Sequence, residues 1–132
     1  MSDTTKFVIT KGIANEYYIT IKQDDSTLPM VIEPADTFEV KIFKLKDSAL
    51  VATIGMIAGT DGQVSVYDDA NGKLKIVLSD ALVTALVMER GDRADYYYSK
   101  PIYRLVIDAS TVNNGDFIAT IDKVYVRKWM YL

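Results

Sequence analysis

The feature that most constrains this chain is the alternation of apolar and polar side chains along most of its 132 positions. A period of two is typical of a β-strand with one buried face, whereas a helix repeats every 3.6 residues. Turn residues separate the alternating stretches, which are 6–11, 16–22, 36–46, 49–56, 63–68, 73–78, 96–109 and 116–129. We therefore predict an all-β chain: a single antiparallel β-sandwich or flattened barrel of about eight strands, with residues 1–132 as one domain.

Two β-hairpins follow from the spacing of these stretches. The segment 36–46, with Phe38, Val40 and Ile42 on one face, is close enough to 49–56 to pair with it. Between 63–68 and 73–78 stands an Asn-Gly pair, a strong hairpin signal because both residues tolerate positive φ. The same stretch, DDANGK, resembles the start of a calcium loop, but a hairpin turn explains it better. A weak surface cation site stays open as an alternative.

The last strand changes its own register. Phe117, Ala119 and Ile121 have one parity, whereas Val124 and Val126 have the other. A β-bulge near Asp122 or Lys123 would turn all five apolar side chains toward the core.

Only one stretch has helical periodicity. Leu82, Val83, Leu86 and Val87 recur at helical spacing after Ser79, which can cap the first amides. We predict one short helix near 80–89, ended by Gly91 at positive φ. The tripeptide that contains Gly91 also spells the integrin-binding sequence, a less favoured reading. In the following strand, Pro101 cannot donate a hydrogen bond and is predicted to mark an edge or a bulge.

Composition excludes several classes of function. The 15 basic and 18 acidic residues are interspersed, so no basic stripe is available for nucleic acid. The sequence has neither cysteine nor histidine, which removes thiolate and histidine-based catalysis and the usual zinc sites. We expect no enzyme activity, no cofactor and no metal. No apolar run approaches the ~20 residues of a membrane span, and no leader is expected at the start, so we predict no membrane partner.

Two aromatic segments are the candidate contact sites. Tyr96, Tyr97 and Tyr98 stand in a row, so a strand would place at least one of them away from the core. The sequence ends on Trp129, Met130, Tyr131 and Leu132, which either cover the open end of the sandwich or dock on a neighbouring chain. Tyrosine and tryptophan are enriched at protein interfaces. We therefore predict these seven residues as an interface, and self-association or docking through them and through sheet edges.

Four segments, in this order, carry a resemblance to known proteins: "DTFEVKIFKLKDSALVATI", "KLKIVLSDALVTAL" after a DG turn, "DYYYSKPIYRLVID" and "FIATIDKVYVR". They resemble the small β-sandwich modules of tailed-bacteriophage virion proteins, found in tail, baseplate and fibre-attachment components. The resemblance covers roughly residues 36 to 127. This sequence departs from the pattern of those modules at Asp122, where their closing strand usually has glycine, and in the extra length of "YYYSKPIY".

The resemblance implies a non-enzymatic structural protein of the virion, assembled in the host cytoplasm and used as a repeated subunit or an adaptor. Its expected partners are other virion proteins and further copies of the chain, in a homo-oligomer. The alternative is a carbohydrate- or receptor-binding β-sandwich that uses residues 96–98 and the 90–92 tripeptide. A hydrolase built on paired carboxylates is the least favoured reading.

Overall fold

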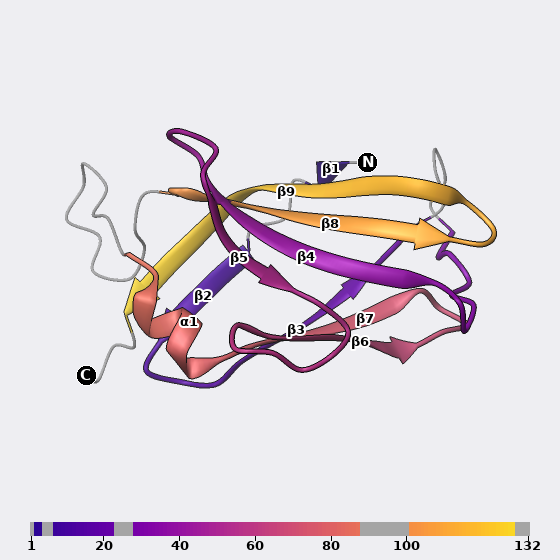
Figure 1. Cartoon of the computed structure of the whole chain (residues 1–132), viewed down its shortest axis with the longest axis horizontal. Helices are drawn as coiled ribbons and strands as arrows, with labels where there is room; N and C mark the ends of the chain where they lie inside the picture. Colours follow the sequence, from indigo (N-terminus) through magenta and orange to yellow (C-terminus); the bar gives the residue numbers. More distant parts are fainter. Residues whose placement is uncertain (1, 4–6, 23–27, 88–100, 129–132) are drawn as a thin grey trace.

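The computed structural model describes residues 2–3, 7–22, 28–87 and 101–128 (Figure 1). These residues form nine strands and one short helix, in the order β1 (Ser2–Asp3), β2 (Phe7–Lys11), β3 (Asn15–Thr20), β4 (Thr37–Lys44), β5 (Leu50–Ile54), β6 (Gly62–Asp68), β7 (Lys73–Leu78), α1 (Asp80–Ala85), β8 (Tyr103–Thr111) and β9 (Gly115–Lys128).

The strands lie in two sheets, which confirms the predicted all-β sandwich. The larger sheet has six strands in the order β1-β9-β8-β4-β5, with β2 also paired to β9, and the smaller sheet has the order β3-β7-β6. In Figure 1 the long strands β9, β8 and β4 form one layer, and β7 and β6 lie in the other. Neighbours are antiparallel except that β1 and β2 both run parallel to β9. The sequence did not predict this parallel pairing.

The core fills the space between the two sheets and is built from alternate residues of the strands. Phe38, Val40 and Ile42 of β4 are buried as predicted. The facing sheet contributes the buried β7 residues Leu74, Ile76 and Leu78. Such side chains each stabilise a fold by about 1.5–3 kcal/mol when they leave water, so alternation on β4 and β7 holds the layers together.

The predicted bulge in the last strand is confirmed. Leu105 of β8 pairs with Ile121 of β9, but Tyr103 pairs with Val124, so β9 uses one extra residue across Asp122 and Lys123. Ile121 and Val124 are both buried as a result.

The predicted helix is also confirmed, but it is shorter than expected. Ser79 caps it, because the Leu82 amide donates to the Ser79 hydroxyl oxygen at 3.1 Å. The helix ends at Ala85, and Leu86 is extended, with only 1% of its surface exposed. The next amide, of Val87, donates to the Tyr103 hydroxyl at 2.9 Å. The helix therefore ends where Leu86 turns into the core in an extended conformation. The prediction that Gly91 ends the helix is wrong.

Both predicted hairpins are present, between β4 and β5 and between β6 and β7. In the second turn only Gly72 has positive φ, at 65°, whereas we expected it at Asn71 as well. A side chain at Gly72 would lie 2.6 Å from the Ile21 carbonyl oxygen, so the close approach also requires glycine. The prediction that Pro101 marks an edge or a bulge within a strand is wrong, because Pro101 lies before β8, which begins at Tyr103.

A buried polar corner fixes where β3 begins. The Asn15 side chain is 5% exposed, and it accepts from the Thr10 amide and donates to the Thr10 carbonyl oxygen, at 3.0 and 2.9 Å. The Tyr17 hydroxyl lies 2.6 Å from Asn15 Oδ1 and 2.8 Å from the Val8 carbonyl oxygen, so it can donate to either. These contacts join the end of β2 in one sheet to the start of β3 in the other. Burial raises the pKa of Tyr17 above its ordinary value, and Arg127 opposes this effect.

The corner generates a pH-dependent prediction. Because the pKa of Tyr17 is raised in the folded state, the unfolded chain loses this proton first, and stability falls as pH rises above the ordinary pKa of 10.0. Tyr17→Phe should lower the free energy of unfolding by about 1 kcal/mol at pH 8, through the lost hydrogen bond. Between pH 8 and pH 11 this difference should shrink by about 1 kcal/mol.

Urea unfolding of wild type and variant at both pH values measures the two differences. Tyr18→Phe, which removes an exposed hydroxyl on the same strand, is the control for loss of one tyrosine hydroxyl. A Tyr17→Phe difference that is the same at pH 8 and pH 11 would contradict the role of the buried hydroxyl.

Candidate binding surface

The two aromatic segments predicted as an interface lie outside the described residues. Tyr96, Tyr97 and Tyr98 fall between Val87 and Pro101, and Trp129, Met130, Tyr131 and Leu132 follow β9. Their role at an interface stays a prediction. The described residues provide a separate candidate surface, on the smaller sheet.

Strand β3 is an edge of that sheet with regular backbone pairing. Its six residues pair with β7 without a register shift, from Asn15 opposite Leu78 to Thr20 opposite Lys73. Among the described strands, β7 is the one that pairs with β3. The other edge of β3 therefore presents backbone N–H and C=O groups in the spacing that another strand would need.

Two of the other sheet edges, on β6 and on β5, carry features that hinder pairing. On β6 the register shifts between Val66 and Asp68, and the Val64 amide already donates to the Gly55 carbonyl oxygen at 2.9 Å. Strand β5 has five residues, and its pairing shifts opposite Ile42 and Phe43. Short strands and bulges are the usual protection of an edge against association. Strand β3 has neither a bulge nor a proline.

Two exposed tyrosines lie on the outer face of the same sheet. Tyr18 of β3 and Tyr67 of β6 are 53% and 62% exposed. Their ring centroids are 4.7 Å apart and their planes make an angle of 65°, an edge-to-face contact. Since β7 separates the two strands in the sheet, the side chains must reach toward each other over β7.

A charged pair borders the tyrosines. Lys75 of β7 is opposite Tyr18, and its Nζ lies 3.0 Å from Oε1 of Glu16, the residue two positions before Tyr18 on β3. The hydrogen bond to Glu16, followed by the charge of Glu16, raises the pKa of Lys75 above its ordinary value. We call Glu16, Tyr18, Tyr67 and Lys75 the tyrosine surface. It offers aromatic area with one cation and one anion.

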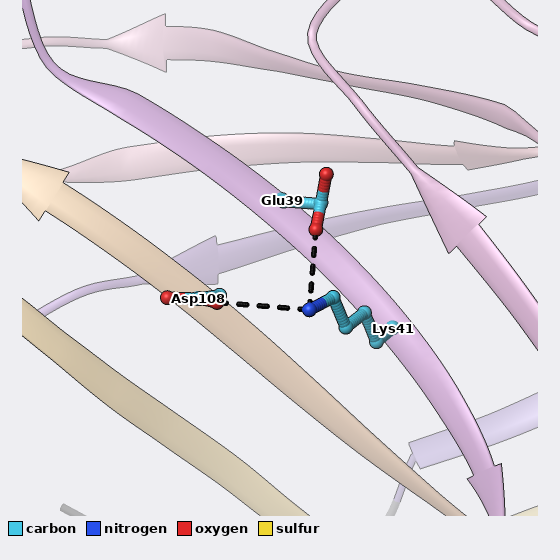
Figure 2. Close-up of polar contacts among 3 residues, drawn as sticks. All are labelled: Glu39, Lys41 and Asp108. Carbon is cyan, nitrogen blue, oxygen red and sulfur yellow. Dashed lines mark ion pairs between the residues drawn. The ribbon is translucent and has the colours of Figure 1, made fainter. Parts of the chain in front are cut away.

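The outer face of the larger sheet is different in character, because charges cover its centre. Figure 2 shows Lys41 of β4 between Glu39 of the same strand and Asp108 of β8, at 3.4 and 3.8 Å. Glu39 and Asp108 are direct cross-strand partners. Lys41 therefore offsets the repulsion between two carboxylates that face each other, and this part of the sheet is well suited to contact with water.

Sequence reasoning missed the tyrosine surface, although one signal for it was present. Tyr18 has the opposite parity to Tyr17, Ile19 and Ile21, which share the inner face, so alternation alone directs Tyr18 outward. Its contact with Tyr67 depends on β3 and β6 flanking β7. No local pattern indicates that arrangement.

Within residues 2–3, 7–22, 28–87 and 101–128, no group of three or more acidic side chains is placed to hold a metal ion. The same ranges contain no helix with the length and hydropathy needed to cross a membrane.

Comparison with known proteins adds little to this picture. No protein-family model and no curated protein matches the chain. Among solved structures, it is similar to the crystal structure of the ZIG-8-RIG-5 IG1-IG1 heterodimer in its monoclinic form, with 11% identity and a TM-score of 0.39 over 96% of this chain and 83% of that one. The strand order itself resembles that of a variable-type immunoglobulin sandwich, with β3-β7-β6 as strands B, E and D, and β9-β8-β4-β5 as G, F, C and C′.

The charges on the larger sheet generate a prediction about salt. Lys41→Gln leaves Glu39 and Asp108 facing each other without a bridging cation. The three side chains are between 32% and 49% exposed, so water screens their charges. The free energy of unfolding should therefore fall by only about 0.5–1 kcal/mol at low salt. In 1 M salt, where the screening length is about 3 Å, most of this loss should disappear.

Denaturant unfolding at the two salt concentrations measures the effect. Lys46→Gln is the matched control, because Lys46 is an exposed lysine in the β4–β5 turn and its loss changes the net charge equally. If both variants lose the same stability at low salt, the bridging role assigned to Lys41 is wrong.

Proposed function

We propose that this chain is a non-enzymatic structural protein of a tailed-bacteriophage virion, and that it acts by protein–protein assembly in a tail, baseplate or fibre-attachment part. The resemblance of its four segments to virion β-sandwich modules supports the class of particle. The observation that carries the assembly role is the regular, unprotected edge of β3 next to two exposed tyrosines. Host cytoplasm is then the place of assembly, and other virion proteins are the partners.

The physical case for assembly rests on what an open edge and an aromatic surface can each supply. A strand edge offers directional backbone hydrogen bonds to a partner strand. Tyrosine is enriched at protein interfaces and among the residues that dominate binding energy. Tyr18 belongs to both features, because it lies on β3 and contacts Tyr67. One partner could therefore engage the edge and the aromatic area together.

Carbohydrate or receptor binding is the alternative function. The exposed tyrosines would be its contact residues in the described part of the chain. The angle of 65° between their rings means that they form no single flat platform for a sugar ring. This geometry favours a protein partner with a contoured surface. A glycan array tests the alternative directly, since an assembly protein should give no sugar-dependent signal.

The proposed function predicts that the particles of the phage that encodes the chain contain it. Mass spectrometry of purified particles should detect it, and a phage that lacks the gene should form few infectious particles unless a wild-type copy is supplied. A copy with Tyr18→Ser and Tyr67→Ser should restore the titre at least about tenfold less well, because tyrosines are among the residues that dominate binding energy at interfaces.

Ile118→Ser is the matched control for this experiment. Ile118 is an apolar residue of β9 that is 58% exposed, and it belongs to the larger sheet. It should restore the titre as well as the wild type does. Particles without the chain, or a titre that does not change when the gene is removed, would refute the proposed function.

A further inference from the structure

We infer that the partner of the β3 edge is β3 of a second copy, paired antiparallel about a two-fold axis through Tyr18. This inference rests on the proposed assembly function and identifies one of its contacts. The smaller sheets of the two copies, which have three strands each, would then form one continuous sheet of six strands.

The alternation of side chains limits the possible registers. In a continuous sheet, residues that face each other across two antiparallel strands point to the same side. Outward residues of one copy must therefore meet outward residues of the other. For two identical strands, the axis must therefore lie midway between the two copies of one residue, so that this residue faces itself. A register in which Tyr17 faces Tyr18 is excluded. The registers centred on Tyr17 and on Tyr18 both keep most of β3 paired.

The aromatic residues favour the register centred on Tyr18. In that register the two Tyr18 side chains are direct cross-strand neighbours, and each already contacts Tyr67 of its own copy. A row of four tyrosines would then cross the outer face of the joined sheet. Aromatic cross-strand pairs stabilise a sheet, and the pairing would cover the ring that is 53% exposed in one copy.

Charge complementarity favours the same register. It places Glu16 of one copy opposite Thr20 of the other, and Lys73 lies beside Thr20 on β7. Because threonine is small, the Lys73 ammonium can reach over it to the Glu16 carboxylate of the partner copy. The axis repeats this contact, so each pairing gains two such ion pairs. The register centred on Tyr17 puts the bulky Tyr18 opposite Glu16 instead.

The absence of cysteine makes the register directly testable. Glu16→Cys and Thr20→Cys variants are purified separately, and each alone and an equal mixture are treated with an oxidant or a short bismaleimide. The mixture should give the cross-linked dimer at least about tenfold faster than either variant alone, because facing Cβ atoms are only about 4.5–5.5 Å apart. Tyr18→Cys should cross-link with itself.

Two further variants keep the result interpretable. Ile118→Cys, an exposed position on the larger sheet, is the control for random collision and should cross-link slowly. Tyr18→Lys places like charges next to each other at the axis, and should weaken the dimer by at least about tenfold in Kd, or about 1.4 kcal/mol, in sedimentation equilibrium. Circular dichroism of each variant checks that the fold is retained.

A mixture that cross-links no faster than the separate variants, or than Ile118→Cys, would overturn the two-fold pairing. If the chain is nevertheless found in particles and needs Tyr18 and Tyr67 there, the proposed function stands and another protein occupies the edge. If the particle experiment also fails, both the pairing and the proposed function are wrong.

Discussion

Strand β9 has one more residue than β8 across Asp122 and Lys123, and the position of the N-terminal strands depends on this insertion. The strand pairs with β8 from Gly115 to Ile121 and again at Val124, and from Val124 onward it also pairs with β2. Without the extra residue, Val124 and the rest of the second half would turn their apolar side chains to water. Strand β2 would then have no apolar surface on which to place its own buried residues. The Arg104 side chain lies 3.7 Å from Asp122 at this point, so the bulge also carries an ion pair on its outer side.

The open edge of the smaller sheet follows from this arrangement. In the constant-type immunoglobulin sandwich the first strand lies beside the second, in the same sheet. Here β2 is drawn to β9, and the chain passes to the other sheet within three residues, Gly12 to Ala14. Gly12 has φ of 92°, and Asn15 fastens the start of β3 to Thr10. Among the described residues, no strand is left to cover the far side of β3. The surface that we assign to assembly is thus a consequence of how β9 is built.

Local patterns predicted the elements of this fold better than their arrangement. Parity placed the bulge at Asp122–Lys123, and Ser79 marked the start of the helix. The helix end could not be read in the same way, because it depends on Leu86 being drawn into the core. Parity also sent Tyr18 outward, but its contact with Tyr67 depends on which strands flank β7. Sheet order is set by pairings between residues far apart in sequence, and alternation gives no information on these.

A two-fold contact between β3 strands has a consequence for any larger assembly. Such a contact uses the same surface on both copies, so it closes at two and cannot by itself extend a ring or a tube. A virion part with many copies therefore needs a second surface, on the outside of the pair. Ile57, which is 88% exposed between β5 and β6, and Val112, which is 66% exposed in the β8–β9 turn, are apolar residues outside the β3 edge. The pairing would supply a rigid unit of two sandwiches, and contacts of this second kind would set the symmetry of the particle.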